Sequence, residues 1–222
     1  LGNVINKKDI IVLDIGGTTA KCALVENGQV KITTNYKIEH SRIEAGYPIQ
    51  TPVIDIVEIG NGGGSIAWID KGGKMHVGPK SAGAMPGPAA YGRNGKNLTT
   101  TDANIITGRI HPDYFLGGEL QPDHNSIDKA AKPLCNQLKG SKEDIAKGIL
   151  RIANANMVNA LKLISINKGY DPRDFTMIVI GGGGAMHGAD LARELQVSEL
   201  IIPPHAGVFS AFGMLMSDIR RD

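Results

Sequence analysis

The segment Asp14–Lys21, with the sequence DIGGTTAK, has the residue types of a phosphate-binding turn. An apolar run over 10–15 predicts a strand that ends near Asp14, and a tight glycine turn then leads straight into a second strand. Such a turn directs backbone N–H groups and threonine hydroxyls into one concavity that suits phosphate oxygens. The predicted phosphate ligands are Gly16, Gly17, Thr18 and Thr19.

Asp14 adds a carboxylate to this turn. Mg²⁺ prefers a few carboxylates together with its own waters, so Asp14 is the predicted magnesium ligand, directly or through water. The Walker pattern GxxxxGK[ST] is absent and no helix follows directly, so the turn is not a P-loop. An ordinary hairpin turn is the alternative interpretation.

A second glycine-rich segment, IGGGGAMHG over 180–188, lies between a predicted strand and a predicted helix. Glycine lets a ligand approach the backbone closely, and a helix N-terminus favours anions. The match to GxGxxG is loose, because Met186 stands at the third glycine. A plain turn is the alternative. The predicted nucleotide contacts are Gly181, Gly182, Gly183 and Gly184, with His187 as a further candidate for ligand contact.

The third glycine-rich segment, IGNGGGSI over 59–66, again offers backbone donors before a serine. Gly63, Gly64 and Ser65 are therefore predicted on the substrate side of a site. A β-bulge or a tight hairpin explains the same residues equally well.

The composition indicates a globular chain with many tight turns. It has 29 glycines and 11 prolines among 222 residues, 41% hydrophobic residues and a net charge of +2. No G-x-y period runs through it, which excludes a collagen, and the low net charge argues against disorder. Charges of both signs are interspersed and no apolar run reaches the ~20 residues of a membrane span, so neither nucleic acid nor a membrane is a predicted partner.

Cysteine and histidine usage predicts neither a disulfide framework nor a zinc site. Cys22 and Cys135 are too few for a disulfide scaffold, and no signal peptide is recognisable, so a cytoplasmic location is expected. No H-x-x-x-H or H-E-x-x-H spacing occurs. The sequence lacks an initiator Met and is expected to be a fragment of a longer protein.

Hydrophobic periodicity predicts an α/β domain with a mixed sheet flanked by helices. Strands are expected within 10–38, where Asn27-Gly28 makes a hairpin turn, and then within 53–70 and at 75–77, 176–180 and 199–202. Helices are expected at 103–109, from Ser141 to about Gly169, at 185–195 and at 208–217. The stretches 78–98 and 111–125 are expected to be loop.

Several segments together resemble the hydantoinase A/5-oxoprolinase family. The most specific part is VGPKSAGAMPGPAAYGR over 77–93, followed by TDAN at 101–104, Gly108-Arg109 and FLGG at 115–118. Further agreement comes from GGGSIAW at 62–68, GYDPRDF at 169–175 and PHAGVFSA at 204–211. The resemblance covers nearly the whole chain.

This resemblance implies an RNase H-like fold, as in actin, the heat-shock chaperone ATPases and sugar kinases, in which two related halves close on ATP. Family proteins usually carry an additional N-terminal half. Residues 1–222 are therefore expected to be a hydantoinase A-type domain that forms the second half of the ATPase, with 71–140 as a loop-rich insertion. Alone, it is expected to bind ATP weakly and hydrolyse none.

The implied activity is the ATP-dependent opening of a cyclic amide such as 5-oxoproline or a hydantoin, with ATP and Mg²⁺, through phosphorylation of the ring carbonyl. Asp14 and Thr18 become the catalytic residues, and Gly181–Gly184 the adenosine-side loop. Implied partners are the cyclic amide, the missing N-terminal half and a second, hydantoinase B-type subunit. Related carboxylases act on acetone or acetophenone.

The sequence departs from the family pattern at two positions. Lys21 stands where many relatives carry Asp, which either places a cation near the phosphates or points it away from the strand. Ala90 stands where many carry Cys, which removes a thiol. Arg93 and Asp102 are the remaining substrate-side predictions, with a salt bridge or a helix cap as their structural alternative. A nucleotide-gated scaffold subunit and a small-molecule kinase stay open as other functions.

Overall fold

The computed structural model describes residues 1–34, 36–38 and 45–216, and in this part a six-stranded mixed sheet forms the centre. Its strands are β1 (Ile10–Ile15), β2 (Ala20–Glu26), β3 (Gln29–Val30), β8 (Ile56–Ile59), β11 (Thr176–Ile180) and β12 (Glu199–Ile201). The order is β12-β11-β1-β2-β3, and β8 also pairs with β2. The strands β1, β11 and β12 are parallel, whereas β2 is antiparallel to β1, β3 and β8. The predicted mixed sheet is confirmed.

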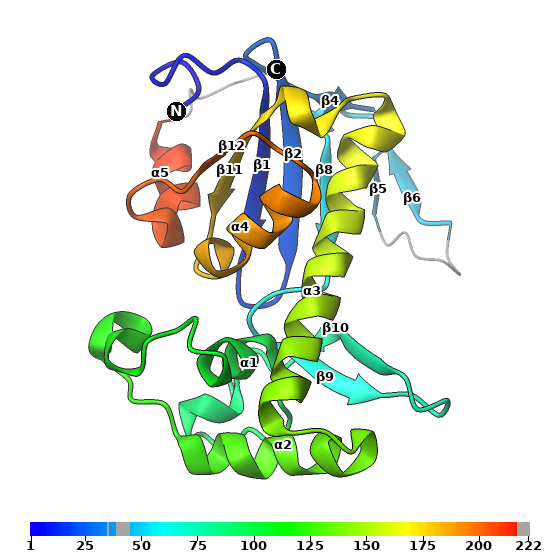
Figure 1. Ribbon diagram of the computed structural model, residues 1–222. Helices are drawn as coiled ribbons and strands as arrows, with labels where there is room; N and C mark the ends of the chain where they lie inside the picture. Colours follow the sequence, from blue (N-terminus) through cyan, green and yellow to red (C-terminus); the bar gives the residue numbers. More distant parts are fainter. Residues whose placement is uncertain (35, 39–44, 217–222) are drawn as a thin grey trace.

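Helices lie on both faces of the sheet (Figure 1). They are α3 (Lys142–Ile164), α4 (Gly184–Glu194) and α5 (Phe209–Leu215). Side chains alternate along β1, so Ile11 and Leu13 join the main core with residues of α3 and α4. On the opposite face, Ile10 and Ile178 form a smaller cluster against Phe209 of α5. Both faces of the central strands are therefore apolar, as in other sheets covered on two sides.

Helix α3 continues past the sheet into a second lobe (Figure 1). This lobe contains β9 (Ser65–Ile69), β10 (Met75–Ser81), α1 (Thr100–Ile106), α2 (His124–Leu138) and the 3₁₀ helices η1 (Ala89–Tyr91) and η2 (Pro112–Gly118). Buried residues of α1, α2 and α3 belong to the same core cluster as those of β1. The two lobes therefore share one continuous hydrophobic core.

The remaining elements are short. Between β3 and β8, two small antiparallel pairs are formed by β4 (Ile32–Thr33) with β7 (Val53–Ile54) and by β5 (Tyr36–Ile38) with β6 (Tyr47–Ile49). The other 3₁₀ helices are η3 (Ile166–Lys168), η4 (Pro172–Asp174) and η5 (Ala206–Val208).

The long predicted helix is confirmed as α3, and its predicted start is correct. Ser141 caps it by accepting a hydrogen bond from Asp144 N–H (3.1 Å), while the Asp144 carboxylate accepts one from the Ser141 hydroxyl (2.6 Å). The helix ends at Ile164, earlier than expected, because the chain tightens into η3 before Gly169 turns it with a φ of +85°.

The sequence pattern missed α2 and placed loop where other elements begin. Asp123 caps α2 by accepting from Ser126 N–H (3.0 Å), and the helix runs through Pro133, a residue that normally argues against a helix interior. The expected loop at 78–98 is partly wrong, because β10 continues to Ser81. The loop at 111–125 is also partly wrong, since η2 lies within it and α2 starts at its end.

The two short predicted helices are confirmed with shifted ends. The helix expected at 103–109 is α1, which starts and ends three residues earlier, at Thr100 and Ile106. The helix expected at 208–217 is α5, and residue 217 lies outside the described residues. Within the described ranges, the helices are all too short or too polar to cross a lipid bilayer.

Candidate functional site

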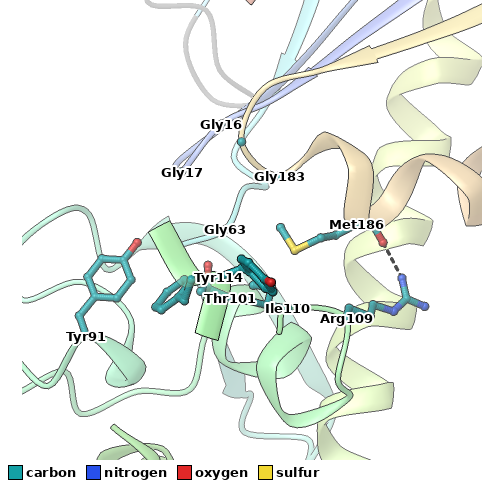
Figure 2. A pocket seen from close by; sticks show the side chains of 12 residues that line it. Gly16, Gly17, Gly63, Tyr91, Thr101, Arg109, Ile110, Tyr114, Gly183 and Met186 are labelled. Atoms are coloured by element: carbon teal, nitrogen blue, oxygen red, sulfur yellow. Dashed lines mark hydrogen bonds between the residues drawn. The ribbon is translucent and has the colours of Figure 1, made fainter. Parts of the chain in front are cut away.

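Two glycine-rich segments meet at the carboxyl ends of the parallel strands β1 and β11, and a third packs against them. Gly16 follows β1 and accepts a hydrogen bond from Gly63 N–H (3.0 Å). Gly183, in the turn after β11, donates to Ile15 O (2.9 Å). Figure 2 shows Gly16, Gly17, Gly63 and Gly183 together along one side of the site. All three segments singled out in the sequence are therefore brought together.

At two of these positions the structure leaves no room for a side chain. Gly64 N–H donates to Gly17 O at 2.6 Å, and a Cβ on Gly64 would lie 3.0 Å from that oxygen. Gly181 has a φ of +83°, and a Cβ there would lie 2.4 Å from Asp14 Oδ1. A side chain at either position would displace its neighbours, so these glycines fix the shape of the site.

Other glycines line a cavity of about 440 Å³ (Figure 2). On the side of the sheet, the lining residues are Gly16, Gly17, Gly63, Gly182 and Gly183; the other walls are Tyr91, Thr101, Arg109, Ile110, Tyr114 and Phe115 of the second lobe, with Met186 of α4. One wall thus offers backbone polar groups, and the opposite walls are largely aromatic and apolar. This arrangement fits a ligand with an anionic end and a flat apolar body.

Sequence reasoning did not assign a role to the residues of the second lobe that line the cavity. Arg109 and Phe115 belong to the family signature, Arg109 also ends the helix expected at 103–109, and Tyr114 lies in the loop expected at 111–125. A usable signal existed, because all six of these residues lie within the signature region 77–118. The signature region therefore supplies the wall of the cavity that belongs to the second lobe.

Asp14 is the penultimate residue of β1 and does not line the cavity. Its Oδ2 atom accepts a hydrogen bond from the Ser210 hydroxyl of α5 (2.6 Å). Its Oδ1 atom borders Gly181, where it occupies the space that a Cβ would need. The carboxylate therefore stands between the two glycine turns that follow β1 and β11.

The other polar residues of the first turn face different ways. Thr18 Oγ1 lies 3.5 Å from the Ser81 hydroxyl at the end of β10, and the carbonyl of Thr19 accepts from Gly16 N–H (3.0 Å). Lys21 Nζ lies 3.7 Å from Glu58 on β8, with half of each side chain exposed. Lys21 lies opposite Asp14 in the pairing of β1 with β2 and is not among the residues that line the cavity.

Ser65 and Gly63 have separate roles in the third segment. Ser65 is fully buried, and its hydroxyl accepts from Gly62 N–H (2.8 Å), so it shapes the turn rather than meeting a ligand. Gly63 lines the cavity, and its carbonyl accepts from Thr101 N–H (2.7 Å) at the start of α1. This hydrogen bond joins the glycine turns to the second lobe.

Asp102 lies in the protein interior rather than on a substrate surface. It is fully buried and accepts hydrogen bonds from the N–H groups of Ala89 (3.2 Å), Ala90 (2.8 Å) and Thr99 (2.8 Å), and from the Thr99 hydroxyl (2.7 Å). Burial raises the pKa of Asp102, and these donors oppose that rise. Asp102 therefore contributes to the cap of α1, as the third helical residue of a capping box whose N-cap is Thr99, and it also holds the signature loop at Ala89 and Ala90.

Arg93 and His187 also lie outside the cavity lining. The Arg93 guanidinium is exposed and sits 5.8 Å from the centre of the Tyr91 ring, which does line the cavity. His187 is only 2% exposed, and its Nδ1 lies 2.7 Å from Asn154 Oδ1 on α3. Arg93 therefore neighbours one residue of the cavity lining, and His187 is a buried residue that contacts α3.

We expect Asp102→Ala to lower the free energy of unfolding by roughly 3 kcal/mol, because it leaves several buried donors without an acceptor. Asp123→Ala is the matched control: it removes the cap of α2 at a partly exposed position and should cost about 1 kcal/mol. Urea unfolding of both variants measures the difference. Equal losses would show that Asp102 is no more than an ordinary helix cap.

We expect protonation of His187 in acid to lower the free energy of unfolding. Burial, aided by the nearby Arg109 charge, lowers the pKa of His187 from 6.5 to about 4. The folded state thus binds fewer protons than the unfolded state, and this stability is complete above pH 6.5 and lost as pH falls towards 4, by on the order of 3 kcal/mol. Urea unfolding at pH 7 and pH 4 measures it. In His187→Gln this part of the pH dependence should vanish, and an unchanged profile would contradict the assignment.

Within the described residues, no group of three or more His, Cys, Asp or Glu side chains could hold a metal ion on its own. Of the two cysteines, Cys22 is buried in β2, and burial raises the pKa of its thiol to about 12. A thiol held protonated in this way is a core side chain and not a nucleophile.

One family model matches the chain over its full length. Residues 1–222 match the family model described as hydantoinase/oxoprolinase. The chain belongs to this family, as its signature indicated.

The curated relatives include proteins named as a caprolactamase or an oxoprolinase and a protein named as a carboxylase subunit. The chain is 39% identical, over 96% of its length, to caprolactamase subunit alpha of Pseudomonas jessenii, and 32% identical, over 99%, to 5-oxoprolinase of Dictyostelium discoideum. It is 33% identical, over 98%, to the acetophenone carboxylase gamma subunit of Aromatoleum aromaticum. It spans only 30%, 18% and 29% of these three proteins, respectively.

Solved structures show the same fold. The crystal structure of the ATP-dependent caprolactamase from Pseudomonas jessenii aligns with 98% of this chain at a TM-score of 0.86 and 36% identity. The nucleotide-free structure of acetone carboxylase aligns with 96% at a TM-score of 0.85 and 29% identity. The chain covers 31% and 29% of those chains.

Proposed function

We propose that this chain is the nucleotide-binding part of an ATP-dependent cyclic amide hydrolase. The observation that carries the proposal is the cavity of about 440 Å³ between three glycine turns and an aromatic wall. On the side of the sheet, Gly16, Gly17, Gly63, Gly182 and Gly183 line this cavity with backbone, which lets a ligand approach the chain closely. Relatives named 5-oxoprolinase and ATP-dependent caprolactamase supply the reaction class.

The sheet topology supports an RNase H-like, actin-like ATPase fold. Strands β1, β2 and β8 form an antiparallel unit, and β11 and β12 then add in parallel on the other side of β1. Helix α3 makes the crossover from the first unit to β11. We propose that residues 62–140 are the insertion of this half, starting earlier than position 71, because Gly62–Gly64 already lead out of the sheet into the second lobe.

We propose one orientation for a nucleoside triphosphate in this cavity. Its phosphates would lie against Gly16 and Gly17, with Thr18 and Thr19 in the same turn. Its adenosine side would lie along Gly181–Gly184, of which Gly182 and Gly183 line the cavity. Its base would lie between Met186 and Tyr114, where the walls are apolar. The N-terminal half that the family resemblance implies would cover the open side of the cavity. Tight binding of ATP is therefore proposed for the full-length protein only.

Asp14 is the carboxylate placed to bind Mg²⁺ through water. A site with one carboxylate fits Mg²⁺, because this ion usually keeps several waters and takes its remaining ligands from phosphate. When bound, Mg²⁺ neutralises charge on the phosphates during transfer. The carboxylate is fixed for this task by Ser210 on one oxygen and by the close contact with Gly181 on the other.

In the proposed reaction, the carbonyl oxygen of the cyclic amide takes the γ-phosphoryl group of ATP and ADP leaves. Water then adds to the activated carbon, and the ring C–N bond breaks with protonation of the nitrogen, which leaves an acyl phosphate. A second water hydrolyses this acyl phosphate to the carboxylate and free phosphate. The chain's own part is to hold the phosphates in line with the ring oxygen, since phosphoryl transfer depends on position and charge more than on covalent help.

The test is ADP formation by the full-length protein with 5-oxoproline, a hydantoin or caprolactam as the ring. We expect one ring to stimulate turnover and to appear in its opened form. Calorimetry with Mg-ATP supplies the second measurement. A full-length protein that neither binds Mg-ATP nor opens any of these rings would refute the proposal.

A second function is favoured by the likeness to acetone carboxylase and to the gamma subunit of acetophenone carboxylase. The chain would then belong to a nucleotide-gated subunit, and a partner subunit would supply the ketone or amide chemistry. ADP formation and ring opening by the full-length protein without a partner would argue against it. Turnover that appears only when a second, hydantoinase B-type subunit is added would support it.

A further inference from the structure

Arg109 joins the two lobes, and in Figure 2 it lies across the cavity from Gly16 and Gly17. It follows α1 in the second lobe, where its own N–H donates to Asn104 O (2.8 Å). Its guanidinium reaches α4 in the other lobe, donating through Nη1 to Met186 O (2.6 Å) and through Nη2 to Asp190 Oδ2 (2.7 Å). Figure 2 shows the first of these contacts beside the Met186 side chain.

The ion pair between Arg109 and Asp190 lies between two neighbouring cavities. Arg109 lines the cavity of about 440 Å³, and it also lines a neighbouring groove of about 430 Å³, whose walls include Asp190, Lys147 and Arg151. Because one side chain belongs to both, the Arg109–Asp190 pair forms the partition between them. Without it, the base end of the cavity would open into a groove that carries two further cations.

Two residues outside the cavity lining, Asn154 and His187, hold the Arg109–Asp190 pair in place. Asp190 Oδ2 also accepts from Asn154 Nδ2 on α3 (3.2 Å), and Asn154 Oδ1 contacts the buried His187 (2.7 Å). The polar chain from Arg109 through Asp190 and Asn154 to His187 thus ties α1, α3 and α4 together around the wall that carries Met186. A planar guanidinium suits this position, because two donors can be aimed at two acceptors on one helix.

We infer that Arg109 is a positioning residue for the nucleotide. It fixes Met186 and the first turn of α4 at the base end of the cavity and closes that end against the neighbouring groove. The inference rests on the proposed nucleotide function. It assigns a separate effect to Arg109: loss of the residue should weaken nucleotide binding and base selection while sparing the phosphoryl-transfer step at the opposite end.

The test compares Arg109→Gln, Arg109→Lys and Arg193→Gln in the full-length protein. Arg193 is the matched control, because it contacts the same Asp190 carboxylate (3.5 Å), is 80% exposed and does not line the cavity. Calorimetry should give a Kd for Mg-ATP about tenfold higher in Arg109→Gln, a smaller rise in Arg109→Lys and no change in Arg193→Gln. The affinity ratio of ATP to GTP should fall in Arg109→Gln only.

Kinetics separate positioning from a general structural role. We expect KM for ATP to rise in Arg109→Gln while kcat at saturating ATP stays within about twofold. If Arg109→Gln does not fold, Asp190→Asn removes the same ion pair and should raise Kd in the same direction. Wild-type protein that binds ATP alongside variants with unchanged Kd and KM would overturn this inference alone. Wild-type protein that binds no ATP would overturn the proposed function together with it.

Discussion

Replacing Asp14 by Asn is expected to lower kcat for ATP-dependent turnover in the full-length protein by a factor on the order of 10³. The substitution keeps the size of the side chain and its ability to accept from Ser210, but it removes the negative charge. That charge is proposed to hold the metal through water or to orient the nucleophile. The affinity for nucleotide should change far less than kcat, because the glycine turns carry the phosphate contacts.

The matched control is Asp9→Asn, at the other end of the same strand. Asp9 Oδ1 accepts from Asn27 N–H (2.8 Å) in the Asn27-Gly28 turn, so it is an equally polar carboxylate remote from the cavity. Turnover in Asp9→Asn should stay within about twofold of wild type. Single-turnover kinetics and Mg-ATP calorimetry on both variants separate chemistry from binding. An Asp14→Asn enzyme with wild-type kcat would remove Asp14 from the mechanism.

The glycine turns were predictable because their signal is local. A strand that ends at Asp14 or Ile180 and is followed by consecutive glycines leaves few structures other than a tight backbone turn. Parallel pairing of β1 with β11 then brings the two turns to one edge of the sheet. The third turn, at 62–64, offered the same local signal, but only the structure shows its hydrogen bond from Gly63 to Gly16.

The second lobe was not predictable in the same way because its structure depends on distant contacts. Asp102 organises the signature loop through N–H groups that lie 12 and 13 residues away, and a lone Asp in a loop gives no sign of being buried. His187 looked like a ligand contact after four glycines, whereas its partner Asn154 lies 33 residues earlier in the chain. Residues of α2 do follow a helical spacing, with Ile127, Ala130 and Leu134 buried, but Pro133 obscured it.

Gly181→Ala and Gly182→Ala are expected to weaken nucleotide binding for different reasons, although the two residues are neighbours. Gly181 has a φ of +83°, and its Cβ would meet Asp14 Oδ1 and Ile15 O at 2.4 Å each. Left-handed backbone strain adds to that clash, so Gly181→Ala should lower the free energy of unfolding by roughly 3 kcal/mol. Because Asp14 must move to make room, turnover should fall as well.

Gly182→Ala should fold like the wild type and yet bind nucleotide poorly. Apart from its two chain neighbours, no heavy atom of the described residues lies within 4 Å of a Cβ at Gly182, so the change in unfolding free energy should stay below about 1 kcal/mol. Gly182 lines the cavity, however, and its new methyl group would take the space where a ligand meets the backbone. We expect Kd for Mg-ATP in the full-length protein to rise about tenfold.

Urea unfolding and calorimetry on the pair distinguish glycines kept for the fold from glycines kept for the ligand. Gly181→Ala should lose stability and binding together, whereas Gly182→Ala should lose binding alone. Normal ATP affinity in Gly182→Ala would mean that the four glycines serve only the packing of β1 against β11, and the nucleotide would then have to bind elsewhere. Because the two positions share one turn and receive the same added methyl group, a difference between them follows from the direction in which each Cβ points.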